Sequence, residues 1–218
     1  MLHYPCLVLD HDDTVVQSTP TINYPSFAET LRILRPGTEL SLQEFQRYCY
    51  EPGFFELCTD ILGFSGEELT VQMEHWRQYG RTHQPLPYAG FAELLREQRG
   101  RGGIVCVVSH SSDENIMRDY QENFGFLPDL IYSSDLPAEK RKPSPYALQD
   151  IMARFKMAPE NLLMVDDLKP GLNMARSCGV PAAAAGWSHI VPELAEDLKC
   201  CSDFYLETVD KLYHLLFD

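Results

Sequence analysis

Three aspartates, Asp10, Asp12 and Asp13, stand within four residues directly after a short apolar run. The run, residues 7–9, predicts a buried strand, and the acids predict that its end opens into a polar site. Carboxylates this close repel one another, and a cation or a set of oriented donors keeps them ionised at low cost. A second acidic pair, residues 166–167, follows another apolar run. Two strand ends that carry acids indicate one shared metal site.

Two further polar residues suit the same site. Ser109 follows the apolar run 103–108, and its hydroxyl and the neighbouring backbone N–H groups suit phosphoryl oxygens. Lys142 precedes Pro143 and supplies a positive charge that offsets repulsion between phosphate and carboxylates. Each feature alone has a simpler interpretation: a serine that begins a helix, a solvated lysine, or an acidic pair in a turn or N-cap. Their combination favours the chemical interpretation.

Short apolar runs and helical patterns alternate along most of the chain. Fully apolar strands that alternate with helices are typical of a parallel sheet covered on both faces. The sequence therefore predicts an α/β fold with a Rossmann-like core. The ligand crevice of such a sheet lies outside the carboxyl ends of its strands, where Asp10, Ser109 and Asp167 would stand. The expected strands are 6–9, 103–108, 130–132, 162–165 and 180–185, and the expected helices are 113–124, 145–156 and 171–178.

Residues 19–87 break this alternation, because they contain helical signals and no good strand. Ser41 is a candidate helix cap, and Ser65 with Glu68 has the form of a capping box. We predict an all-helical cap domain at 19–87, inserted into a core domain of residues 1–18 and 88–218. Extra helices packed rigidly on the core remain the alternative.

The composition is that of an ordinary globular protein with an acidic surface. The 218 residues include 32 Asp and Glu against 18 Lys and Arg, which gives a formal charge of −14. This charge argues against nucleic acid or an anionic membrane as the main partner. A small phosphorylated substrate stays compatible with it, because a metal and a few cations can reverse the potential inside one cleft.

The sequence shows no run of eighteen apolar residues, and residues 1–5 lack the features of a signal peptide. We therefore expect a cytoplasmic protein without a membrane partner. A monomer is the default, and an oligomer stays open. The seven cysteines are dispersed with no CxxC pair, which predicts reduced, buried thiols in place of a disulfide frame.

Four short sequences resemble, in the same order, the four motifs of the haloacid dehalogenase-like (HAD) superfamily. They are Asp10-x-Asp12-x-Thr14, Ser109, Lys142-Pro143 and Asp166-Asp167. The resemblance covers essentially the whole chain, with the insert 19–87 in the place of a helical C1 cap. Within this superfamily, the chain is similar to the branch that contains phosphoglycolate phosphatases and beta-phosphoglucomutases.

The resemblance implies a Mg²⁺-dependent phosphomonoester hydrolase that acts on a small phosphorylated metabolite. Asp10 would be the nucleophile that forms an aspartyl phosphate, and Asp12 the general acid and then base. Ser109, the backbone N–H of His110 and Lys142 would bind the phosphoryl group. The implied metal ligands are Asp10, the backbone carbonyl of Asp12, Asp167, and Asp166 directly or through water.

One position departs from the family pattern, since Asp13 stands where the family usually has glycine. We expect Asp13 to be strained or to adopt a left-handed conformation, which aspartate tolerates. Asp12 is present, whereas family members that act as dehalogenases lack this acid. Carbon–halogen cleavage and a phosphonatase-like reaction are therefore disfavoured.

Three other functions remain open at this point. A phosphomutase of the same family would return the phosphoryl group to substrate, and steady phosphate release without a bisphosphate activator would argue against it. A phosphoacceptor receiver also combines acids, a hydroxyl and a lysine, but its motif order differs and it lacks a helical insert of this size. A catalytically inactive HAD-fold binding protein would use the cap to recognise a partner.

Overall fold

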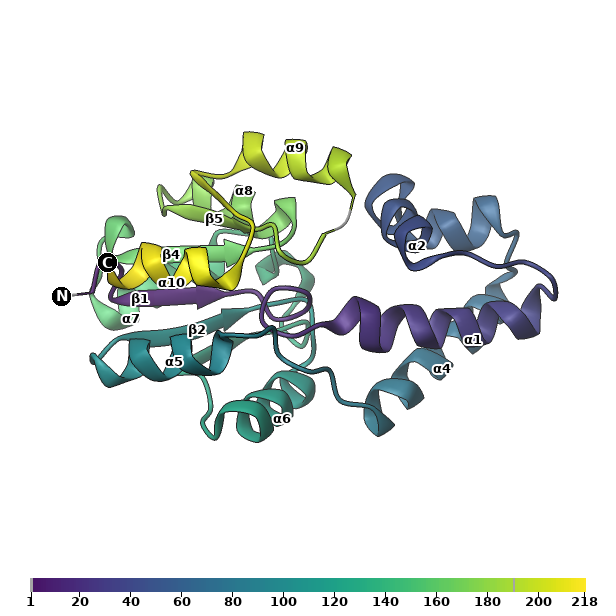
Figure 1. The fold of residues 1–218 in the computed structure, drawn as a ribbon, viewed down its shortest axis with the longest axis horizontal. Helices are drawn as coiled ribbons and strands as arrows, with labels where there is room; N and C mark the ends of the chain where they lie inside the picture. Colours follow the sequence, from purple (N-terminus) through teal and green to yellow (C-terminus); the bar gives the residue numbers. More distant parts are fainter. Residues whose placement is uncertain (1, 190) are drawn as a thin grey trace. The chain divides into compact units, whose positions relative to one another are not determined.

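A computed structural model of the protein describes residues 2–189 and 191–218, which form two compact units (Figure 1). The larger unit contains the chain up to Val16, Pro87–Ser188 and Ala195–Asp218. The smaller unit contains Gln17–Leu86 and the described residues between His189 and Leu194. The domain boundaries expected from the sequence stay a prediction.

The larger unit is built on a six-stranded parallel sheet in the order β3-β2-β1-β4-β5-β6. The first strand lies in the middle of this sheet, where Leu9 pairs with Val107 on one side and with Val165 on the other. The residues that follow these neighbouring strands therefore meet at one edge. The strands are β1 (Cys6–Leu9), β2 (Ile104–Val108), β3 (Leu130–Tyr132), β4 (Leu162–Asp166), β5 (Ala182–Ala185) and β6 (Phe204–Leu206).

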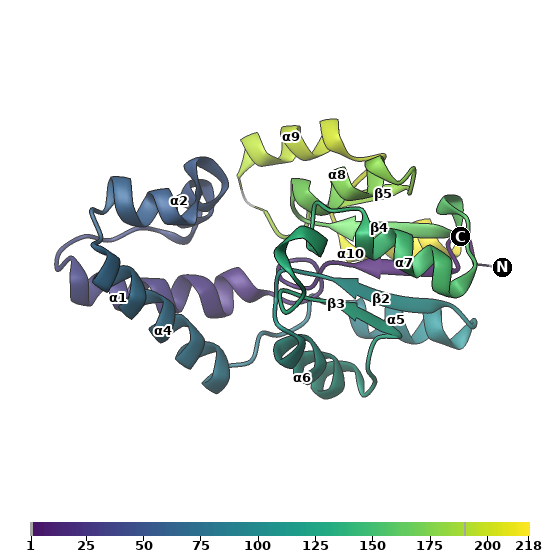
Figure 2. The same cartoon turned by 180° about the vertical axis from the view of Figure 1, so that it is seen from behind.

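Helices cover both faces of the sheet, which confirms the predicted fold class. Leu7 and Leu9 of β1 pack into a core cluster with α5, α6 and α10, and the opposite face carries α7 and α8 (Figure 2). The strands are buried on both sides, so their sequences are continuously apolar. The helices of this part of the chain are α5 (Phe91–Gly100), α6 (Asp113–Phe124), α7 (Tyr146–Phe155), α8 (Lys169–Ser177), α9 (Pro192–Cys201) and α10 (Val209–Phe217).

The sheet contains one strand that the sequence pattern did not predict. β6 is an edge strand of three residues, and its Phe204 and Tyr205 are only partly buried. The available signal was the run Phe-Tyr-Leu, which is as short and as partly buried as the predicted strand β3. The fifth strand also begins at Ala182, two residues later than expected.

The described residues of the insert are helical, as the sequence predicts. Ser41 and Ser65 begin helices with complete capping boxes. The carboxylates of Glu44 and Glu68 accept from the backbone N–H groups of these serines, whose hydroxyls accept in turn from the glutamate backbone N–H groups. The unit has its own apolar core, which includes Phe27. Its helices are α1 (Tyr24–Leu34), α2 (Leu42–Tyr48), α3 (Phe54–Glu56) and α4 (Gly66–Thr82), with π-helical turns at Thr19–Asn23, Cys49–Gly53 and Leu57–Ile61.

All seven cysteines are free thiols, which agrees with the expected absence of a disulfide frame. Cys6, Cys58 and Cys106 are buried, whereas Cys200 is exposed and the other three are partly buried. The expectation of burial therefore holds for only part of the set. No described helix has the length and apolar character needed to cross a bilayer.

Candidate active site

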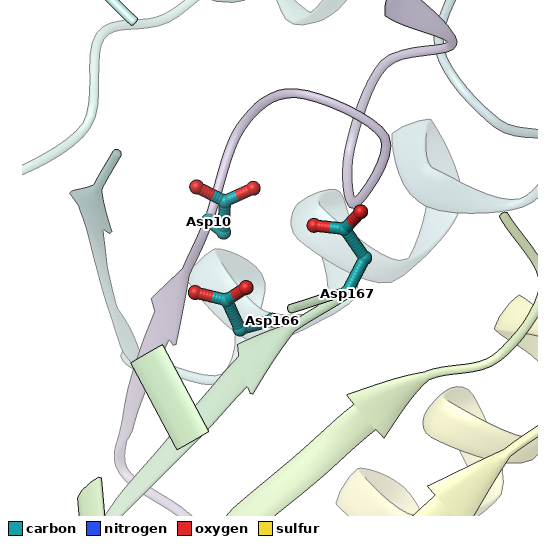
Figure 3. A group of neighbouring side chains, drawn as sticks. All are labelled: Asp10, Asp166 and Asp167. Carbon is teal, nitrogen blue, oxygen red and sulfur yellow. The ribbon is translucent and has the colours of Figure 1, made fainter. Parts of the chain in front are cut away.

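Three carboxylates from two adjacent strands come together at the carboxyl edge of the sheet (Figure 3). Asp10 follows β1, Asp166 ends β4, and Asp167 is the next residue. One oxygen of each lies within 4.8 Å of the others, and all three residues are buried. The Asp10 backbone N–H donates to the Val165 carbonyl oxygen at 2.9 Å, which extends the pairing of the two strands into the site.

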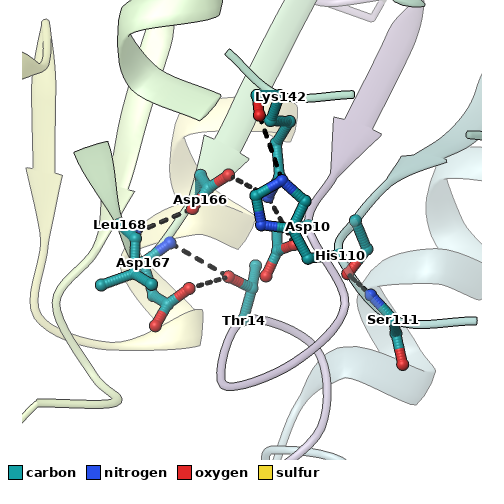
Figure 4. Close-up of polar contacts among 9 residues, drawn as sticks. Asp10, Thr14, His110, Ser111, Lys142, Asp166, Asp167 and Leu168 are labelled. Carbon is teal, nitrogen blue, oxygen red and sulfur yellow. Dashed lines mark hydrogen bonds and ion pairs between the residues drawn. The ribbon is translucent and has the colours of Figure 1, made fainter. Parts of the chain in front are cut away.

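Lys142 lies against two of these carboxylates (Figure 4). Its Nζ donates to Asp10 Oδ1 at 2.7 Å and to Asp166 Oδ2 at 2.6 Å. Burial lowers the pKa of Lys142, but the charges of Asp10 and Asp166 outweigh burial and raise it above its ordinary value. The ammonium group therefore stays charged at neutral pH.

The acidic cluster carries more negative charge than Lys142 balances. Three carboxylates around one ammonium leave two negative charges when all are ionised. Burial, together with repulsion from Asp10 and Asp167, raises the pKa of Asp166 above its ordinary value. A hard divalent cation with oxygen ligands would supply the missing charge, so the donor set fits Mg²⁺.

Thr14 connects the loop after β1 to the loop after β4. Its hydroxyl donates to Asp167 Oδ1 at 3.3 Å and accepts from the Asp167 backbone N–H at 3.1 Å. Asp166 Oδ1 accepts from the Leu168 backbone N–H at 2.8 Å. Hydrogen bonds from the loop after β1 therefore orient Asp167, and one from the loop after β4 orients Asp166. Thr14 belongs to the first motif, but its place in the sequence alone predicts no role.

The first loop also contains the two remaining acids of the motif. Asp12 is partly buried and pairs with Val16 in an isolated bridge. Asp13 has φ +56°, so it adopts the left-handed conformation expected where the family has glycine. Its backbone N–H donates to the Val16 carbonyl oxygen at 2.7 Å, which closes the turn.

Ser109 lies directly after β2, the other neighbour of β1. Its backbone N–H donates to the Tyr132 carbonyl oxygen at 2.9 Å, and its Oγ accepts from the Ser111 backbone N–H at 3.2 Å. The His110 ring lies 3.1 Å from the Lys142 carbonyl oxygen, with Nε2 as the donor. This ring contact ties the serine loop to the lysine loop, a connection that the sequence did not predict.

Residues 4–179 match the haloacid dehalogenase-like hydrolase family. The protein is a member of this family. The chain is also 22% identical over 217 residues to a phosphoglycolate phosphatase of Vibrio vulnificus, which covers 94% of each protein.

Solved structures of HAD proteins share the fold over nearly the whole chain. A HAD family hydrolase from Deinococcus radiodurans, with bound phosphate and sodium, has a TM-score of 0.79 and 18% identity, and the match covers 99% of this chain and 98% of that one. CbbY from Rhodobacter sphaeroides, in complex with xylulose-(1,5)bisphosphate, has a TM-score of 0.69 and 19% identity, with 97% and 96% covered. The predicted membership and fold are therefore confirmed.

Two buried residues of this HAD hydrolase escaped the sequence analysis. His11 and Asp119 are 0% and 1% exposed in their side chains, and His11 Nε2 lies 3.1 Å from Asp119 Oδ2. Burial lowers the pKa of His11, but the hydrogen bond to Asp119 and the charges of Asp12 and Asp10 raise it overall. A polar residue between two acids that follow an apolar run was the available signal for His11. For Asp119 the available signal was helical spacing, because a residue three positions after Ile116 and next to Tyr120 lies on the apolar face of the helix.

Gly171, in the first turn of α8, leaves room for the carboxylate of Asp166. A Cβ at this position would lie 1.9 Å from Asp166 Oδ2 and 2.9 Å from Met164 Cε. We expect Gly171→Ala to destabilise the HAD hydrolase by about 1–3 kcal/mol and to displace Asp166 from Lys142. Urea unfolding measures the first effect.

Gly100→Ala is the matched control, because a Cβ at Gly100 meets no described atom within 4 Å. It should leave stability unchanged or slightly improved, since alanine favours a helix more than glycine does. Equal stabilities for the Gly171 and Gly100 variants would contradict the steric role of Gly171.

Proposed function

We propose that the protein hydrolyses phosphomonoesters of small metabolites, with Mg²⁺ as cofactor and an aspartyl phosphate as intermediate. The observation that carries this proposal is the position of Asp10, which lies beside Lys142 and two further carboxylates at the edge of the sheet. A buried carboxylate next to a fixed cation is suited to attack a phosphoryl group that this cation helps to hold.

The proposed metal ligands are Asp10, Asp167, the backbone carbonyl of Asp12, and Asp166 directly or through water. The negative charge that Lys142 leaves uncompensated in the cluster supports a divalent ion there. When bound, Mg²⁺ would neutralise phosphoryl charge and so lower repulsion with the nucleophile.

In the first proposed step, a carboxylate oxygen of Asp10 attacks phosphorus, and the bond between phosphorus and the leaving oxygen breaks. Asp12 donates its proton to that leaving oxygen. In the second step, Asp12 takes a proton from water, which attacks the phosphoryl group and releases phosphate and free Asp10. Lys142, Ser109 and the His110 backbone N–H hold the phosphoryl oxygens through both steps.

The comparisons support a small phosphorylated substrate. One relative is named a phosphoglycolate phosphatase, and one structural neighbour is in complex with a bisphosphorylated sugar. The helical insert is the part of this chain that we assign to recognition of the leaving group. We also propose that the enzyme acts in the cytoplasm and as a monomer.

A screen of common phosphometabolites with Mg²⁺ tests this function. We expect wild-type protein to release phosphate from a subset of sugar phosphates or short phosphorylated acids, and to stop when EDTA is added. Steady release without a bisphosphate activator would favour the phosphatase over the phosphomutase. Failure to release phosphate from any ester faster than Asp10→Asn would refute the proposal.

We expect Asp167→Asn to raise the Mg²⁺ concentration needed for half-maximal activity at least about tenfold, because it removes one charged ligand. The fold should persist, since Thr14 can still bond the amide. Asp210→Asn is the control, because Asp210 is an exposed acid on α10 whose side chain is 80% accessible. A Mg²⁺ titration identical in both variants would place the metal elsewhere.

A further inference from the structure

We propose that His11 and Asp119 are positioning residues, which fix the loop that carries the general acid Asp12. This inference rests on the proposed phosphatase function and adds to it an unassigned position of the first motif, His11, and a residue of α6 that none of the four motifs includes. It begins from a buried ion pair that joins the first loop to α6 across 108 residues of sequence.

The orientation of the His11 ring depends on one hydrogen bond. Nε2 contacts Asp119 Oδ2 at 3.1 Å, while Nδ1 is buried and has no hydrogen-bond partner among the described residues. The ring also lies 5.9 Å from the ring of Tyr120, on the same helix. Burial of Nδ1 without a hydrogen bond costs free energy. Packing does not require this histidine, since an apolar side chain would fill the space without an unsatisfied atom.

Asp119 is a fixed partner for this histidine. Its second oxygen, Oδ1, accepts from Arg118 Nε at 2.8 Å, and its side chain is 1% exposed. The helix itself is held in the core by Ile116 and Tyr120, which are both fully buried. A carboxylate with both oxygens engaged on a packed helix gives the first loop a rigid attachment.

The loop that contains Asp12 also closes on the backbone of His11. The carbonyl oxygen of this residue accepts from the backbone N–H groups of Val15 and Val16, at 3.0 and 3.2 Å. The turn 11–16 therefore closes on His11, and any rotation of this residue carries the turn with it. Asp10, in contrast, has anchors of its own: the Lys142 ammonium and the Val165 carbonyl. Loss of the His11–Asp119 contact should therefore disturb proton transfer more than nucleophilic attack.

Two phosphomonoesters separate these steps. A p-nitrophenyl ester has a leaving group that departs without a proton, whereas an alkyl ester needs the proton from Asp12. We expect His11→Leu to slow release of the leaving group in the first turnover about tenfold or more with the alkyl ester and less than about threefold with the aryl ester, at unchanged affinity for both. The first turnover is measured because hydrolysis of the aspartyl phosphate, which also uses Asp12, is common to both esters. Asp119→Leu should give the same pattern, and the double variant should be no worse than either single one.

Asp119→Asn serves as the rescue, because its amide oxygen still accepts from His11 Nε2, and it should restore the ratio of the two rates. Ile116→Val is the matched control for lost packing on the same helix, and it should leave this ratio unchanged. Parallel losses in the first-turnover rates of both esters, or no loss in either, would overturn the positioning role.

Amide hydrogen exchange gives a readout that does not depend on turnover. In His11→Leu we expect the amides of residues 12–16 to exchange faster than the fall in global stability explains, while those of β1 keep their protection. Unchanged exchange at 12–16 would overturn the inference. A wild type that hydrolysed neither ester would count against the proposed function alone, and the exchange experiment would still decide the role of His11.

Discussion

Asp10→Asn is expected to lower phosphate release by at least about 10³-fold, because the amide cannot act as the nucleophile that forms the phosphoenzyme. The substitution keeps the shape of the side chain and an oxygen for the Lys142 hydrogen bond. The variant should therefore fold and melt like the wild type. Release of inorganic phosphate from the best substrate of the screen measures the effect.

A trapping experiment makes this test specific to the intermediate. Rapid acid quenching of wild-type protein during turnover should leave a labile phosphate on the peptide that contains Asp10, and the asparagine variant should carry none. Asp210→Asn, on the exposed face of α10, provides the control and should turn over normally. A labile phosphate on another residue, or turnover that survives in Asp10→Asn, would contradict the nucleophilic role.

Lys142→Met is expected to have the largest effect on stability. Without the ammonium, the carboxylates of Asp10 and Asp166 stay buried with no counter-charge from this side chain, which costs about 3–5 kcal/mol. The loss should appear in EDTA-treated protein as a lower urea midpoint. Added Mg²⁺ should recover part of it, because a divalent ion bound at the cluster compensates the same charges.

The raised pKa of Asp166 decides how the destabilisation by Lys142→Met depends on pH. A carboxyl whose pKa is raised in the folded state destabilises the fold as pH rises, and the pKa of Asp166 is already raised in the wild type despite Lys142. Without Lys142 this shift grows. The difference in unfolding free energy between wild type and variant should therefore grow as pH rises through about 8, the pKa of Asp166 in the wild type, and be larger at pH 9 than at pH 6.

Lys199→Met is the matched control for Lys142→Met. Lys199 forms an exposed pair with Glu196 on α9, and its loss should cost less than about 1 kcal/mol at either pH. Similar midpoints for the two methionine variants would show that the Lys142 ammonium does not compensate the buried acids.

The sheet and the residues at its edge could be predicted because each leaves a local signal. A strand buried on both faces is a continuous apolar run, and a polar residue directly after it, such as Asp10 or Ser109, marks the end that faces ligand. The left-handed conformation of Asp13 was predicted from the glycine that the family has at this position, since aspartate is one of the few other residues that tolerate it. The short edge strand β6 offers only a three-residue apolar run.

Contacts between distant segments could not be read from the sequence where no strand end marks the residues. His11 and Asp119 are 108 residues apart, and although helical spacing places Asp119 on the apolar face of α6, nothing in the sequence names His11 as its partner. The same holds for Gly171, whose lack of a side chain matters only because Asp166 lies against it. Such residues become visible when the fold sets the distances between them.

The bonds that hold the acidic cluster also bear on which ions it would accept. Lys142 restrains Asp10 and Asp166 at 2.7 and 2.6 Å, and Thr14 restrains Asp167 through two hydrogen bonds. Calcium takes more ligands at longer distances than magnesium and needs carboxylates that can swing outward. Tethered acids resist that movement. The rigidity of the three carboxylates would therefore favour magnesium over calcium, a preference that oxygen ligands alone do not provide.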